Sequence, residues 1–287
     1  MVPMKEDLPD LKAFLPSDLG TQKRTKSRKP LTRADAADAG SSRRIGDERL
    51  AEGEITDAIH HYRRAVRQDD ADPENRLRLA DSYQLAEMGV QAASQYEKLL
   101  KQRKSKPEAH VGLAEVYRRY GKHRAGIMRL KKACELNPGN AFYWFKLADA
   151  LVAAGVAQDS VEPAARAALA EPQDVFYRIW LGDLLLSVGR AEEAVSSFRT
   201  ALALSPGEDD VYAKLAAALC ASGRPAEARA PIQLACDLDP KNEVHSAVHN
   251  EVLKRCGQAP LAMDPELDAY GQHALKRWKQ LAGSLHG

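Results

Sequence analysis

Small and apolar residues recur along this chain with one constant period, beginning at Ala39. Six consecutive repeats align without an insertion or a deletion, the first over residues 39–72 and the last over residues 209–242. Position 7 of every repeat is aliphatic, and positions 8 and 20 are always small. The residues at position 8 are Gly46, Ala80, Ala114, Ala148, Gly182 and Ala216. Self-similarity at a period of this length indicates one supersecondary motif that is stacked along the chain.

Glycine and proline mark where the elements of each repeat end. They recur with the same period at positions 15 and 32, as Gly121, Gly155, Gly189 and Gly223, and as Pro138, Pro172, Pro206 and Pro240. Glycine suits the left-handed residue that follows a helix, and proline cannot continue a helix. Each repeat is therefore predicted to be a helix, a glycine turn, a second helix and a proline stop, which makes the fold all-α.

These repeats resemble the tetratricopeptide repeat family, and the fifth repeat matches it well through Leu181-Gly182, Gly189, Ala194, Phe198, Ala201 and Pro206. The resemblance covers residues 39–242, and a seventh first helix extends the repeat domain to residue 257. It implies a right-handed α-solenoid of helix-turn-helix repeats, whose first helices line a concave surface. Residues 258–287 are predicted to form a C-terminal capping helix that covers the last apolar face.

Two features of the repeats depart from the family pattern. Glu87 occupies the glycine position of the second repeat, so its turn is expected to differ. Pro163 and Pro231 fall inside predicted second helices, where a proline costs about 3 kcal/mol. We therefore expect the second helix of the fourth repeat to start late, with Ser160 as its N-cap, and that of the sixth repeat to kink.

Residues 1–38 are predicted to form a largely disordered tail, because they contain four prolines and no sustained apolar period. One short segment in this tail is different. Leu11, Phe14 and Leu15 are spaced i, i+3, i+4, which places them on one face of a single helical turn. A turn of this length is not stable alone, but it is suited to dock on a partner protein.

The charge of the chain is concentrated in the same tail. The net charge is +2, from 42 Lys and Arg against 40 Asp and Glu, and a balance so close argues against a polybasic nucleic-acid coat. Residues 22–33 nevertheless contain six basic residues and no acid, and five of them are candidate nucleic-acid contacts: Lys23, Arg24, Lys26, Arg28 and Lys29. No aromatic residue lies among them, so this segment has no side chain on which nucleic-acid bases could stack. Two alternatives stay open, a nucleic-acid-associated adaptor and an adaptor that this tail autoinhibits.

Sequence motifs of catalysis and of membrane insertion are missing. No apolar stretch approaches the roughly 18 residues of a membrane span, and the acidic start does not look like a signal peptide, so a cytoplasmic protein is expected. The phosphate-binding, dinucleotide-binding and zinc-protease motifs are absent. The four cysteines do not cluster, and His245 and His249, four residues apart, lack a third ligand. No enzymatic activity, metal or cofactor is expected.

Acidic residues recur at position 9 of the repeats, on the predicted first helices. They are Asp47, Asp81, Glu115, Asp149, Asp183 and, in the partial seventh repeat, Glu251. By the family resemblance, this position usually faces the groove, so these residues are expected to form a carboxylate ladder. The alternative is local pairing with the basic residues three positions earlier, worth about 0.2–0.5 kcal/mol a pair on a solvated helix.

Aromatic and aliphatic side chains occupy positions 2 and 5 of the fourth and fifth repeats. These are Phe142, Phe145, Phe176 and Ile179, where other repeats have residues such as Glu74 and Glu108. Aromatic residues at positions that normally face water suggest the floor of a binding groove, although they could also pack between repeats. With acids beside them, they suit an apolar or basic peptide or helix and disfavour an acidic one. The sequence thus predicts a protein-binding scaffold or adaptor within a larger assembly.

Overall fold

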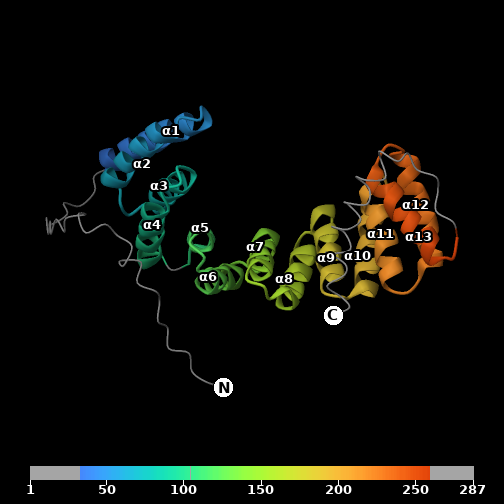
Figure 1. Cartoon of the computed structure of the whole chain (residues 1–287). Coiled ribbons are helices and arrows are strands. Elements are labelled where there is room, and N and C mark those ends of the chain that lie inside the picture. Colours follow the sequence, from blue (N-terminus) through green and yellow to red (C-terminus); the bar gives the residue numbers. More distant parts are fainter. Residues whose placement is uncertain (1–32, 104, 259–287) are drawn as a thin grey trace, which may run out of the picture. The chain divides into compact units, whose positions relative to one another are not determined.

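The computed structural model describes residues 33–103 and 105–258, with side chains from Asp38 onwards. Within these ranges the chain forms thirteen α-helices and no strand, which confirms the all-α helical-repeat fold (Figure 1). The chain divides into two compact units, which we call the N-terminal unit, up to Pro138, and the C-terminal unit, from Gly139. No described helix is both long enough and apolar enough to cross a membrane.

The described helices of the N-terminal unit belong to the first three repeats. They are α1 (Arg33–Ala51), α2 (Ile55–Gln68), α3 (Pro73–Leu85), α4 (Gly89–Gln102), α5 (Pro107–Arg119) and α6 (His123–Leu136). Odd-numbered helices are the first helices of the repeats, and even-numbered helices are the second. Helix α1 begins at Arg33, before Ala39, so its start falls within residues 1–38, which the sequence assigned to the tail.

The C-terminal unit contains the remaining repeats. Its described helices are α7 (Ala141–Ala153), α8 (Ala157–Ala170), α9 (Val175–Ser187), α10 (Ala191–Leu204), α11 (Asp209–Ala221), α12 (Pro225–Leu238) and α13 (Glu243–Arg255). Helix α13 is the predicted seventh first helix. The tail motif of Leu11, Phe14 and Leu15, the basic residues between Lys23 and Lys29, and the capping helix predicted within 258–287 lie outside the described residues.

Small residues let the paired helices approach closely, as the repeat pattern predicts. Gly182 in α9 faces Phe198 in α10, and a Cβ built on this glycine would lie 2.5 Å from Cε1 of Phe198. Gly46 faces Tyr62 in the same manner. Phe198 and Tyr62 are both completely buried. The large residue at position 24 therefore fills the space that the small residue at position 8 leaves free.

The turns inside the repeats have one shared backbone conformation. Glycines at position 15 have positive φ angles between 68° and 82°: Gly53, Gly121, Gly155, Gly189, Gly223 and Gly257. Glu87 has the same conformation, with φ of 58°. The amide of Met88 donates to the carbonyl of Tyr83 at 2.8 Å, just as Arg190 donates to Leu185. The prediction that this turn differs is therefore wrong. The hydrogen bond that ends the helix holds the backbone of Glu87 in the left-handed region of φ.

We predict that Glu87→Gly stabilises the N-terminal unit by about 1 kcal/mol. The left-handed conformation costs a residue with a Cβ about 1–2 kcal/mol, and the greater flexibility of unfolded glycine offsets part of that gain. Chemical unfolding of the full chain, followed by circular dichroism, measures the change. Glu87→Ala is the matched control, since it removes the carboxylate and keeps the strain. Equal stability of the glycine and alanine variants would contradict the prediction.

The two internal prolines do not shorten their helices. Helix α8 begins at Ala157, with Val156 as its N-cap, and continues through Pro163. The expected late start at Ser160 is wrong: this residue lies inside the helix, where its hydroxyl donates to the carbonyl of Ala157. Pro163 and its neighbour Ala164 are buried, so packing outweighs the lost backbone bond. Helix α12 likewise runs through Pro231 as a single helix.

Candidate functional site

An aromatic cluster joins α7 and α9 in the C-terminal unit, and we define it as Phe145, Phe176, Tyr177 and Trp180. The ring centroid of Phe145 lies 4.9 Å from that of Trp180, 5.3 Å from that of Phe176 and 6.0 Å from that of Tyr177. The contacts are edge-to-face, an arrangement that aromatic rings prefer. Phe176 is 50% exposed, so the cluster reaches the surface.

The start of α9 holds Phe176 in place. The side chain of Asp174, the N-cap of this helix, accepts a hydrogen bond from the amide of Phe176 at 2.9 Å. Phe176 and Trp180 are four residues apart, which places both on one face of α9. Two predicted residues, Phe145 and Phe176, thus meet in the cluster. Tyr177 and Trp180 were not predicted as site residues, although the i, i+4 spacing of Phe176 and Trp180 was the available signal.

The other two predicted apolar residues lie elsewhere. Phe142 is 45% exposed, and its ring neighbours are Tyr143, at 6.3 Å between centroids, and the ammonium of Lys146, at 5.4 Å. Ile179 is partly buried against the core of the C-terminal unit. Ile179 thus lies at the edge of the core, as do Tyr177 and Trp180 of the cluster. Phe142 and Phe176, in contrast, are about half exposed.

Acidic residues at position 9 of the N-terminal unit bind donors of the chain itself. Asp81 accepts a hydrogen bond from the hydroxyl of Tyr96 at 2.6 Å, and Asp47 accepts one from Tyr62 at 2.7 Å. Burial raises the pKa of Asp81, and the bond from Tyr96 opposes this rise. Glu115 forms an ion pair with Arg118 on the same helix. These contacts explain the three carboxylates by packing and local pairing.

In the C-terminal unit, Asp183 and Asp149 differ in their surroundings. The ammonium of Lys214 lies 2.5 Å from Asp183, and it opposes the rise in pKa that burial imposes on this carboxylate. Lys214 is on α11 and belongs to the next repeat. Among the described residues, the carboxylate of Asp149 has neither a hydrogen bond nor an ion pair. The pairing expected between Asp149 and Lys146, three positions earlier, is therefore not found. At Asp183 that earlier position is Trp180 rather than a base.

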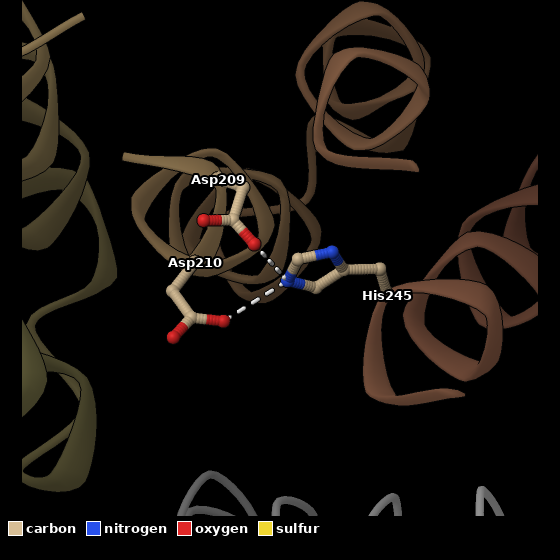
Figure 2. A group of neighbouring side chains, drawn as sticks. All are labelled: Asp209, Asp210 and His245. Atoms are coloured by element: carbon tan, nitrogen blue, oxygen red, sulfur yellow. Dashed lines mark hydrogen bonds and ion pairs between the residues drawn. The ribbon is translucent and has the colours of Figure 1, made fainter. Parts of the chain in front are cut away.

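A second group of polar side chains lies between α11 and α13 (Figure 2). Nε2 of His245 lies 3.0 Å from Oδ1 of Asp210 and 3.7 Å from Oδ2 of Asp209. The possible ligand atoms of these three side chains lie close enough together to hold a metal ion. A structural zinc site takes four protein ligands, however, and both carboxylates stand in the first turn of α11, where the helix dipole already stabilises them. The geometry fits a hydrogen bond between Nε2 of His245 and Asp210 that connects α13 to α11.

His249 does not share this site with His245. Its Nδ1 lies 3.8 Å from the sulfur of Cys236 in α12. Burial is the largest cause of the lowered pKa of His249, which disfavours its protonated form. The two histidines that are four residues apart in the sequence therefore face different helices and pack separately.

The comparisons with known proteins agree on the fold. Two family models described as tetratricopeptide repeat match the chain, over residues 107–150 and over residues 185–249. No curated protein has a sequence that matches this one. Several hundred solved chains match the structure.

Three of these solved structures illustrate the likeness. YrrB, described as a tetratricopeptide repeat protein with an unusual peptide-binding site, is 20% identical with a TM-score of 0.55, and the match covers 64% of this chain and 95% of YrrB. PilF of Pseudomonas aeruginosa is 13% identical with a TM-score of 0.57, covering 77% and 99%. A tetratricopeptide repeat protein of Parabacteroides merdae is 12% identical with a TM-score of 0.55, covering 88% and 94%. At these identities the likeness concerns the fold.

Proposed function

The chain is a tetratricopeptide-repeat protein, and we propose that it is a non-catalytic, cytoplasmic adaptor that holds a partner protein within a larger assembly. Proteins with these repeats are in general protein-interaction scaffolds. The observation that carries the proposal is the aromatic cluster, because its rings meet across two consecutive repeats and Phe176 is half exposed. We assign the binding of a partner segment to this cluster.

Physical arguments favour a peptide or a helix as the bound segment. Aromatic side chains supply much apolar area with little loss of conformational freedom, and for this reason they dominate the energy of many interfaces. Asp149 and Asp183, on α7 and α9, add negative charge and favour a segment that is apolar and basic. The peptide-binding site named in the description of YrrB supports a peptide as the partner.

Selection of displayed peptides on the full chain tests this function. A library of random short peptides is selected, and the dissociation constants of the recovered peptides are measured. We predict that Phe176→Ala weakens their binding at least tenfold, which corresponds to about 1.4 kcal/mol. Because Phe176 is half exposed, this variant should keep the helix content of the wild type.

The matched control is Leu169→Ala in the same unit. Leu169 is 68% exposed on α8 and belongs to a second helix, away from the ring contacts of the cluster. Its removal should leave peptide affinity within twofold of the wild type. If Phe176→Ala and Leu169→Ala bind the selected peptides equally well, the aromatic cluster is not the binding site.

A further inference from the structure

Acidic residues at position 9 pair with the following repeat at two places in the structure. Asp183 is bound by Lys214, with 2.5 Å between Oδ2 and Nζ. In the other unit, Asp47 lies 3.8 Å from Nε of Arg78. In both pairs the base stands at position 6 of the repeat that follows the acid. At these two places the stacking of one repeat on the next thus brings a cation to the carboxylate.

Trp180 occupies the equivalent position in the repeat after that of Asp149. It stands at position 6 of the repeat that follows Asp149, but its side chain carries no charge. Its ring instead contacts Phe145 in the aromatic cluster, at 4.9 Å between centroids. Among the described residues, the carboxylate of Asp149 has no hydrogen bond or ion pair. It therefore lacks a cation like Lys214, which pairs with Asp183 in the next repeat.

Asp149 also lies on the same face of α7 as the aromatic cluster. It follows Phe145 by four residues, so the two side chains are neighbours on the helix surface. Both residues are partly buried. Lys146, one turn before Asp149, has its ammonium over the ring of Phe142 and forms no ion pair with Asp149. A partly buried carboxylate therefore borders a ring cluster of which Phe176 is half exposed.

We propose that this carboxylate receives an arginine of the bound segment, an inference that rests on the proposed function and names its partner chemistry. The guanidinium pairs with Asp149 through two parallel hydrogen bonds, and its plane stacks on Trp180. In this way the partner supplies the cation that Lys214 supplies to Asp183. Arginine is favoured over lysine because only its planar group combines bidentate pairing with stacking on an aromatic ring.

The test is a double-mutant cycle on the full chain with one selected peptide. The peptide is recovered by the displayed-library selection, and an analogue carries citrulline, which is uncharged and similar in shape, in place of arginine. We expect the citrulline analogue to bind the wild type about tenfold more weakly. Asp149→Asn should lose the same factor towards the arginine peptide and lose nothing further towards the analogue. Asp159→Asn is the control, because Asp159 is an exposed acid on the second helix α8, and it should not change the ratio between the two peptides.

Substitution of Trp180 separates charge from ring contact. Trp180→Lys places the chain's own cation beside Asp149, as Lys214 does beside Asp183, and should abolish the preference for arginine over citrulline. Trp180→Leu lacks that cation and should retain a preference of several-fold at lower overall affinity. Loss of the preference only in the lysine variant supports the assignment.

The inference and the proposed function fail in different ways. If the recovered peptides depend on Phe176 but contain no recurring arginine, or show no coupling to Asp149, the arginine assignment is overturned and the aromatic site stands. If no recovered peptide depends on Phe176, the proposed site itself is wrong, and the arginine assignment is overturned with it.

Discussion

Replacing Gly182 by alanine is expected to destabilise the C-terminal unit by about 2–3 kcal/mol, although alanine is the better helix former. A Cβ at this position would lie 2.5 Å from Cε1 and 2.7 Å from Cζ of Phe198. The ring of Phe198 is completely buried, and a close-packed core offers it no space to move into. The clash therefore outweighs the gain in helix propensity of about 1 kcal/mol. Chemical unfolding followed by circular dichroism measures the result.

A helical glycine in open space provides the control. Gly40 lies inside α1, and a Cβ added to it would meet no atom within 4 Å. Gly40→Ala should therefore stabilise the chain by up to about 1 kcal/mol. If Gly182→Ala stabilises the chain as Gly40→Ala is expected to do, the close approach of α9 and α10 does not limit stability.

A second substitution tests whether the clash has the assigned cause. Adding Phe198→Leu to Gly182→Ala reproduces the combination found in the third repeat, where Ala114 stands with Leu130. The double variant should be more stable than the sum of the single effects predicts, since residues in contact are coupled. Additive effects would mean that the alanine is accommodated without touching the ring.

The positions of the helices could be predicted from the sequence because two features recur with one period. A glycine marks the turn inside most helix pairs, a proline follows four of the six pairs, and small residues recur where helices touch. The partner of each small residue was harder to predict. Gly182 faces the ring of its own repeat, but Gly112 faces the ring of Tyr96, which belongs to the preceding repeat. The position of a residue in the repeat predicts which face of its helix it lies on. It does not predict whether a large ring packs against its own repeat or against a neighbouring one.

Local rules failed where tertiary contacts decide the outcome. Glu87 adopts the glycine conformation because the helix-terminating hydrogen bond and the packing of the next helix require it. Pro163 stays inside α8 because its neighbours are buried. Propensity is a weak prior that packing overrides, and both residues illustrate this.

The candidate site was predicted in part. Position in the repeat identified Phe145 and Phe176, and these rings do meet. Pairing of the acids was predicted within one helix, whereas Lys214 reaches back from the next repeat to Asp183. A rule for i, i+3 neighbours cannot find such a contact, since it depends on how one repeat stacks on the next. For the same reason, the unpaired state of Asp149 among the described residues became visible only with the structure.

Replacing His245 by alanine is expected to cost about 3 kcal/mol and to release α13 from α11. His245 has no exposed surface, so truncation leaves a cavity in the packing of the two helices. It also removes the bond from Nε2 to Asp210, and a hydrogen bond to a charged group contributes about 1.5–3 kcal/mol. The two effects share one side chain and need not add fully.

The loss should be local, because each element of a stacked-repeat protein is stabilised mainly by its neighbours. Hydrogen exchange of the full chain measures it. In His245→Ala, amides of Glu243–Arg255 should exchange far faster, while amides of α9 keep their protection. His249→Ala is the matched control on the same helix: this ring is also buried, but its polar contact is a sulfur at 3.8 Å and not a carboxylate, so a smaller effect is expected.

A glutamine variant separates the hydrogen bond from the packing. His245→Gln retains a polar hydrogen-bond donor and most of the side-chain length, so it can still donate to Asp210. It should therefore recover part of the protection that alanine loses. If all three variants leave α13 as protected as in the wild type, the contact with Asp210 is not what anchors this helix. Protection that falls with His245→Ala and is partly restored by His245→Gln assigns the anchor to the bond between His245 and the first turn of α11.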